Sequence, residues 1–299
     1  MEITAPSEIA DLISLESHDG VRLSVQTLGS ANRRSVVLLH GFGQTIHAWQ
    51  DTAASLAQRN YQVLNYDARG HGQSDYAAPD RYRIDDFLAD LRTVTSQLDH
   101  APVIIGASMG GLTALLAAGE APVLPVKAMI LVDIAPRWSQ KGLRKILDFL
   151  HAYPNGFDNL EQVRNAVQLY LPGRKRQYRP EGLMKNLRAG SGGRLHWHWD
   201  PAMLELTRRS EVHQQRLVRA ARGITCPVLL ISGGRSELLD DSSIEDFLNL
   251  VPQARHVKVA KASHMVAGDD NHQFNTVILN YLNELDDDTQ SSNSRRKIL

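Results

Sequence analysis

The sequence has a single cysteine, Cys226, among 299 residues. One thiol excludes a disulfide within the chain, which rules out the disulfide-stapled class of small secreted domains and suits a reducing compartment. Cys226 stands before Pro227 at the start of an apolar run. This setting is typical of a buried structural thiol rather than a reactive one.

The chain has no formal net charge at pH 7, because its 33 Lys and Arg residues balance its 33 Asp and Glu residues. A balanced chain has no general attraction for nucleic acid or for an anionic membrane. No apolar run approaches the ~20 residues that span a bilayer. Residues 1–7 lack the basic segment and apolar run of a secretory signal. The sequence therefore predicts a cytoplasmic protein with neither nucleic acid nor membrane as a partner.

Hydrophobic residues make up 42% of the sequence, which is enough to bury a sizeable core. Short apolar segments typical of strands alternate with segments of helical periodicity. The expected strands are Val21–Leu28, Ser35–Leu39, Tyr61–Tyr66, Val103–Ile105, Ala128–Val132, Pro227–Ile231 and His256–Val259. The expected helices are His47–Arg59, Ile84–Leu98, Met109–Ala118, Ile244–Leu250 and Phe274–Leu285. Strands that are apolar on both faces and separated by helices predict an α/β fold with a parallel sheet covered on both sides.

The alternation stops between Pro136 and Ile224, where the pattern predicts only helices. We expect Lys141–His151, Leu160–Tyr170 and Met203–Arg222 to form a helical cap over one end of the sheet. The predicted organisation is a core of residues 1–135 and 225–285, a cap of residues 136–224, and a polar tail of residues 286–299 that we expect to be disordered.

The strongest chemical motif is Gly106-Ala107-Ser108-Met109-Gly110, between an apolar strand and a helix of small residues. A sharp strand-to-helix turn strains the central residue and requires small neighbours, which Gly106 and Gly110 supply. The turn holds the Ser108 hydroxyl out above the end of the sheet. This context predicts a nucleophile at Ser108.

A second glycine-rich segment, His40-Gly41-Phe42-Gly43, follows the strand Ser35–Leu39. Attack on a carbonyl places negative charge on one oxygen, and two backbone N–H groups must already point at it. We predict that the N–H groups of Phe42 and Met109 form this oxyanion hole. His40 is expected to order its loop through hydrogen bonds.

The predicted base is His264, which lies in a loop after the last strand and far downstream of Ser108. An acid must orient its imidazole, and two residues at the ends of strands qualify. Asp133 follows Ala128–Val132, and Glu237 follows Pro227–Ile231 with Ser236 beside it. Position alone does not choose between Asp133 and Glu237.

Together these motifs resemble the α/β-hydrolase superfamily. The resemblance includes the loop Asp67-Ala68-Arg69-Gly70-His71-Gly72-Gln73-Ser74, which is mostly structural in the family. It implies a mostly parallel central sheet flanked by helices, with a helical cap inserted after the sixth strand. The cap and this loop are similar to the branch of serine esterases, epoxide hydrolases and cofactor-free haloperoxidases. Ser108 stands where epoxide hydrolases and haloalkane dehalogenases have an Asp nucleophile, and relatives whose acid follows the earlier strand favour Asp133 by analogy.

The residues therefore predict hydrolysis of a small carboxylic ester, or of a lactone or thioester, without a metal or cofactor. His196 and His198 could suggest metal ligands, but no third ligand at useful spacing accompanies them. Aromatic residues of the insertion predict a mainly apolar ester-like substrate. Alternatives are C–C bond hydrolysis, perhydrolysis, a lyase step, or a ligand receptor with little turnover. The oligomeric state is left open.

Overall fold

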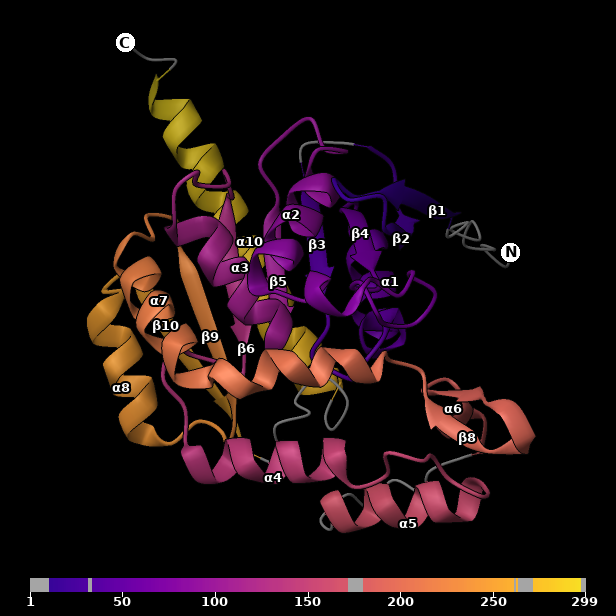
Figure 1. The fold of residues 1–299 in the computed structure, drawn as a ribbon. Coiled ribbons are helices and arrows are strands. Elements are labelled where there is room, and N and C mark those ends of the chain that lie inside the picture. Colours follow the sequence, from indigo (N-terminus) through magenta and orange to yellow (C-terminus); the bar gives the residue numbers. More distant parts are fainter. Residues whose placement is uncertain (1–10, 32–33, 172–179, 261, 263–270, 297–299) are drawn as a thin grey trace.

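The structure, a computed structural model, describes residues 11–31, 34–171, 180–260, 262 and 271–296 (Figure 1). Its centre is a mostly parallel sheet of eight strands in the order β1-β2-β4-β3-β5-β6-β9-β10. The strands are β1 (Asp11–Glu16), β2 (Arg22–Leu28), β3 (Ser35–Leu39), β4 (Gln62–Tyr66), β5 (Val103–Ala107), β6 (Ala128–Val132), β9 (Val228–Gly233) and β10 (Ala254–Val259). Among the described strands of this sheet, β2 runs antiparallel to both of its neighbours, β1 and β4, and the other pairs are parallel. This is the α/β-hydrolase fold that the sequence predicts.

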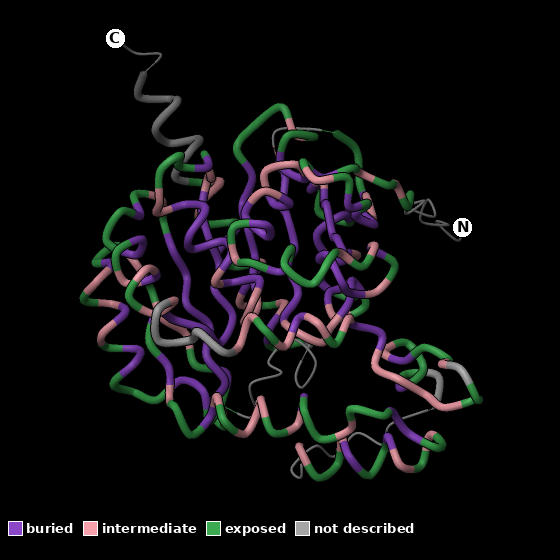
Figure 2. The backbone as a smooth tube through the Cα atoms, in the orientation of Figure 1, coloured by how far each residue is buried: buried purple, intermediate pink, exposed green. Residues whose placement is uncertain are grey.

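Helices cover both faces of the sheet. Strands such as β3 and β6 are therefore buried along their whole length. Side chains alternate between the two faces. Val37 and Leu39 belong to one core cluster, and Val36 and Leu38 belong to the other. The first cluster includes residues of α2 (Ile84–Thr95), α3 (Met109–Gly119), α7 (Ser210–Arg222) and α8 (Asp241–Leu250). The second includes residues of η1 (Ile46–Trp49), α1 (Gln50–Ala57) and α10 (Asn271–Arg296). Figure 2 shows the buried strands as the centre of the molecule.

We predicted only helices in the insertion after β6, and this is wrong because the insertion also contains a short β-hairpin. It contains α4 (Gln140–His151), α5 (Leu160–Tyr170) and α6 (Pro180–Met184), followed by strands β7 (Leu187–Ala189) and β8 (Leu195–Trp197) around η3 (Ser191–Gly193). β7 and β8 form an antiparallel hairpin. Strands of three residues are too short to show a period of two. Figure 1 shows α4 and α5 lying past the ends of the core strands.

The predicted helix Met203–Arg222 is two elements, η4 (Pro201–Arg209) and α7. α7 packs directly on α3, where a Cβ added to Gly119 would lie 2.0 Å from the Ala220 carbonyl oxygen. Leu217 and Ala220 are buried in the core cluster that includes α3. α7 therefore belongs to the core layer, although it falls within the residues 136–224 predicted as the cap.

Residues 286–299 are predicted as a disordered tail, and α10 includes residues of this segment as far as Arg296. Asp286 fastens the helix to the core. Its carboxylate accepts hydrogen bonds from Arg34 Nη2 at 2.5 Å, Tyr61 OH at 2.7 Å and Lys127 Nζ at 2.7 Å. No helix in the part of the chain that the structure describes is both long and apolar enough to cross a membrane. Cys226 is half-buried, and burial raises the pKa of its thiol to about 11.

Candidate active site

Ser108 occupies the sharp turn between β5 and α3. Its backbone has φ 47° and ψ −117°, which is a rare conformation for a residue with a side chain. The first turn of α3 begins at Met109, directly after it. Ser108 is half-buried rather than sealed in the core. The strained turn predicted from the sequence is present.

Three glycines allow the turn to pack closely. A Cβ on Gly106 would lie 2.6 Å from the Gly110 carbonyl oxygen, and a Cβ on Gly110 would lie 2.5 Å from the Leu39 carbonyl oxygen. A Cβ on Gly111 would lie 2.4 Å from Ile134 Cγ2. Real Cβ contacts are not this short, so each position requires glycine. The predicted need for small neighbours around Ser108 is confirmed.

Replacing Gly110 with alanine is therefore expected to lower the free energy of unfolding by about 2–3 kcal/mol, because β3 would have to move away from α3. Chemical denaturation monitored by circular dichroism measures this change. Gly182→Ala in α6 is the matched control, since a Cβ at Gly182 meets nothing within 4 Å. The control should be neutral or stabilising by up to about 1 kcal/mol. Equal stability of the two variants would show that the turn is not tightly packed.

The loop after β3 approaches Ser108 through Gly41, where an added Cβ would lie 3.2 Å from Ser108 Cβ. Gly41 N–H donates to Gln44 Oε1 at 2.8 Å, and Gln44 N–H donates to the Gly41 carbonyl at 3.1 Å. Neither Phe42 N–H nor Met109 N–H donates to an acceptor among the described residues. Both are therefore available to a ligand, as an oxyanion hole requires.

Gly43, on the other side of Phe42, is held by two histidines. Its N–H donates to His71 Nε2 at 3.0 Å, and its carbonyl accepts from His198 Nε2 at 3.2 Å. His198 Nδ1 accepts from Gly72 N–H at 2.9 Å. Because His198 follows β8 of the insertion, a cap residue helps to fix the peptide that follows Phe42. No sequence pattern indicated this contact.

His40 also has a structural role, as predicted. Its Nε2 accepts from Ala68 N–H at 3.0 Å, so its Nδ1 carries the proton and donates to the Gly41 carbonyl at 2.9 Å. Burial lowers the pKa of His40 and lowers that of His71 well below its usual value. Burial also lowers the pKa of His198 to about 4. All three imidazoles are therefore neutral at pH 7, and each accepts a backbone N–H.

These histidines predict a protein whose stability falls in acid. A histidine with a lowered folded-state pKa favours folding above its unfolded pKa, and stability is lost as the pH falls toward the folded value. With a folded pKa of about 4 and an unfolded pKa of about 6.5, His198 alone should account for about 3 kcal/mol of loss by about pH 4. Urea denaturation across this range measures the loss.

The His198→Gln variant should be less stable at neutral pH but should lose less stability on acidification. The exposed His100→Gln variant is the control and should keep the slope of the unmodified protein. A His198→Gln slope equal to that of the unmodified protein would contradict the assignment of His198 as a buried neutral group.

The two candidate acids lie in different environments. Asp133 is fully buried, with φ 50°, and its carboxylate accepts from Gly233 N–H at 2.9 Å and from Ser236 Oγ at 2.5 Å. Glu237 has 57% of its side chain exposed and forms an ion pair with Lys145 of α4 at 2.7 Å. Ser236 donates a hydrogen bond to Asp133, a role that the sequence did not predict.

His264, the predicted base, lies outside the described residues.

The loop Asp67–Ser74 is structural, as predicted. Asp67 accepts from Ile46 N–H at 2.8 Å and from Gln73 N–H at 2.9 Å. Arg69 is fully buried and bonds the carboxylates of Asp90 and Asp19. Burial alone would lower the pKa of Arg69, but these two carboxylates raise it overall. The loop thus supports the segment that contains Phe42.

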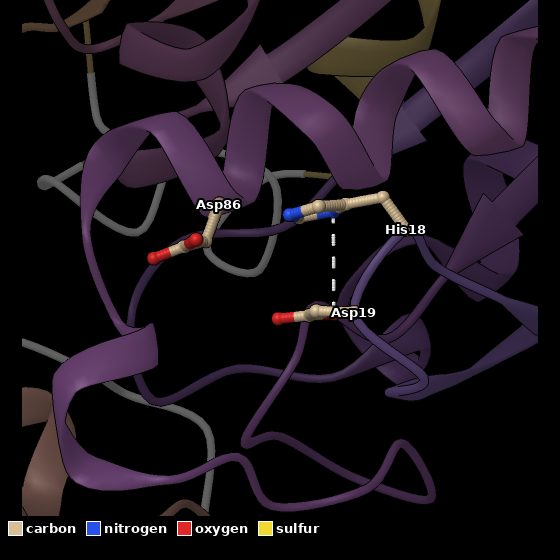
Figure 3. Close-up of side chains that lie close together, drawn as sticks. All are labelled: His18, Asp19 and Asp86. Carbon is tan, nitrogen blue, oxygen red and sulfur yellow. Dashed lines mark ion pairs between the residues drawn. The ribbon is translucent and has the colours of Figure 1, made fainter.

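His18, Asp19 and Asp86 are close enough together to be considered as metal ligands (Figure 3). However, both carboxylates already have donors. Arg69 bonds both oxygens of Asp19 and lowers the pKa of Asp19. Arg83 N–H donates to Asp86 at 2.9 Å, which caps α2. Asp19 therefore belongs to the ion pairs of Arg69, and Asp86 belongs to an ion pair with Arg83.

This chain is similar to known proteins in sequence and in structure. A family model described as the alpha/beta hydrolase fold matches residues 34–169. The 3-hydroxybutyrate-oligomer hydrolase of Cupriavidus necator is 27% identical over 76% of this chain and 80% of its own length. The sn-1-specific diacylglycerol lipase of Mus musculus is 27% identical over 85% of this chain and 82% of its own length. The crystal structure of E-2-(acetamidomethylene)succinate hydrolase superposes with a TM-score of 0.77 at 22% identity, covering 92% of this chain and all of that one.

Proposed function

Because this chain belongs to the α/β-hydrolase superfamily, we propose that it hydrolyses a small carboxylic ester through an acyl-enzyme on Ser108. The conformation of Ser108 is the observation that carries the proposal. A φ of 47° at a residue flanked by glycines without room for a Cβ is a strain that an ordinary turn does not need. The two relatives named as a hydrolase and a lipase act by hydrolysis, and a lipase cleaves carboxylic esters.

In the proposed first step, Ser108 Oγ attacks the ester carbonyl carbon and gives its proton to His264. The carbonyl oxygen becomes an oxyanion, which the N–H groups of Phe42 and Met109 bind. The intermediate collapses with cleavage of the carbon–oxygen bond, and His264 returns the proton to the leaving alcohol. Water, deprotonated by His264, then attacks the acyl carbon, the bond to Ser108 Oγ breaks as His264 returns the proton to Ser108, and the acid is released.

We assign the role of the acid to Asp133. A triad acid holds its histidine in one orientation and is itself held by hydrogen bonds. Asp133 fits because it is buried and accepts from Gly233 N–H and Ser236 Oγ. Glu237 does not fit as well, since an exposed carboxylate paired with Lys145 has little fixed orientation.

Apolar groups of the cap surround the proposed oxyanion hole and support an apolar acyl or alcohol group as substrate. The Trp199 ring meets Phe42 edge to face, with centroids 5.2 Å apart. Leu150 of α4 lies 3.8 Å from the position of a Cβ on Gly43. Further into the cap, Tyr170 stacks on Phe149 with centroids 4.2 Å apart.

A substrate panel tests the proposal. We expect hydrolysis of p-nitrophenyl acetate and butyrate, with a burst of p-nitrophenol as the acyl-enzyme accumulates. Lactones, thioesters, β-diketones and a peroxide assay complete the panel. Faster cleavage of a β-diketone than of any ester would overturn the ester assignment in favour of C–C bond hydrolysis. Turnover at background level with tight binding that survives Ser108→Ala would indicate a ligand receptor.

A further inference from the structure

A cavity of about 240 Å³ lies between the core and the cap hairpin. From the core it is lined by the start of η1 and by the loop after β4, and from the cap by residues of and before β7. The lining residues are Thr45, Ile46, His47, Asp67, Gly72, Gln73, Tyr76, Lys185, Leu187, Arg188 and His198. Ser108, Phe42, Met109 and Asp133 are not among them. The cavity is therefore separate from the proposed catalytic groups, and its volume suits a ligand smaller than a typical drug molecule.

Two cationic side chains of the cap line this cavity. Lys185 and Arg188 form no ion pair with any carboxylate that the structure describes. The Arg188 guanidinium lies 4.5 Å from the centre of the Tyr76 ring, so the stacking orients it and leaves its N–H donors for another partner. From the core side, His47 faces the same space. Burial and the positive charge of Lys185 both lower the pKa of His47.

The one acidic residue of the lining, Asp67, does not neutralise these cations. Its carboxylate is 1% exposed, and its two oxygens accept from Ile46 N–H and Gln73 N–H. The lining therefore has two positive charges against one buried and hydrogen-bonded negative charge. Thr45 and the exposed Gln73 add a hydroxyl and an amide.

We propose that this cavity binds a small anion, carrying a carboxylate or a phosphate, between Lys185 and Arg188 of the cap and His47 and Gln73 of the core. A planar guanidinium beside an ammonium is the donor set that carboxylates and phosphates prefer. A bound anion joins the cap hairpin to the core next to His198, which holds Gly43. The proposal does not rest on ester hydrolysis, because none of the four residues proposed to hold the anion is a proposed nucleophile, base, acid or oxyanion donor.

Calorimetric titration of the full chain with inorganic phosphate and, separately, with succinate tests the site, at an ionic strength held constant with sodium chloride. We expect saturable binding of at least one anion, with a Kd of about 0.1–1 mM. The arm that binds identifies the ligand class as phosphate or carboxylate. The same affinity is expected in Ser108→Ala, which separates this site from the proposed catalytic one.

Variants locate the binding. The double variant Lys185→Gln, Arg188→Gln should weaken binding at least tenfold, and Arg188→Lys should fall between it and the unmodified protein. Arg222→Gln removes an exposed cation of α7 that does not line the cavity, so it should bind like the unmodified protein. The proposal is overturned if neither anion binds saturably, or if the double variant, shown to be folded by its Tm, binds as tightly as the unmodified chain.

Discussion

Replacing Ser108 with alanine is expected to lower kcat for p-nitrophenyl butyrate by about ten-thousandfold or more. The reason is chemical, because the proposed acyl bond forms at the Ser108 hydroxyl and the proposed base, His264, would have no proton to accept. Alanine fits the site sterically, and the variant keeps the strained φ of 47° that the backbone already has at this residue. Its Tm should therefore change little.

Initial rates measured with purified protein test this prediction, with Ser96→Ala as the control. Ser96 is an exposed serine at the end of α2, and its hydroxyl donates to the Thr93 carbonyl and accepts from the neighbouring Gln97 amide. The control should keep full activity. Activity of Ser108→Ala within a few-fold of the unmodified protein would remove Ser108 from the mechanism.

Asp133→Asn is expected to cost about a thousand- to ten-thousandfold in kcat, and Glu237→Gln less than about threefold. Asparagine matches aspartate in size, but its amide nitrogen donates where a carboxylate oxygen accepted. The Ser236 hydroxyl therefore loses its acceptor. The predicted histidine is then no longer held in one orientation. Glu237 is exposed, and its loss removes only a surface ion pair with Lys145.

The paired measurement of kcat and Tm for these two variants distinguishes a catalytic role from a structural one. If Asp133 only ordered its loop, Asp133→Asn would lower the Tm without a matching loss of kcat in the folded protein. A larger rate loss in Glu237→Gln than in Asp133→Asn would reverse our assignment of the acid.

The sheet could be predicted from the sequence because its strands are continuous apolar runs. β3 and β6 were predicted with the observed bounds, since every residue in them is buried. β1 was missed because it is an edge strand with an exposed outer side and pairs only with β2. The hairpin of β7 and β8 was missed because three-residue strands have no visible period, and its stability comes from the cap's own core around Phe157 and Leu187.

The site was predictable where it depends on neighbouring residues in the chain and unpredictable where it depends on distant ones. The turn at Ser108 needs glycines within three residues, so its motif is local. The choice between Asp133 and Glu237 depends on which side chain points inward, and both follow strands of the same sheet. The bond between His198 and Gly43 joins residues 155 positions apart, and no spacing rule connects them.

The α10 helix also depends on contacts between residues that are far apart in the sequence. A polar segment without periodicity looked like a free tail, but Asp286 meets Arg34, Tyr61 and Lys127, which come from three separate parts of the chain. Three donors on one carboxylate hold α10 to the core at Asp286, and no local pattern in the sequence connects these four residues.

The central claim is that Ser108 is an activated nucleophile. Labelling with a fluorophosphonate, followed by peptide mass spectrometry, tests it most directly, because the reagent bonds only to a serine whose hydroxyl is deprotonated as it attacks. We predict one adduct per chain, located on the peptide that contains Ser108, and blocked by prior incubation with an ester substrate. An unlabelled protein, or an adduct on a different serine, would contradict the account.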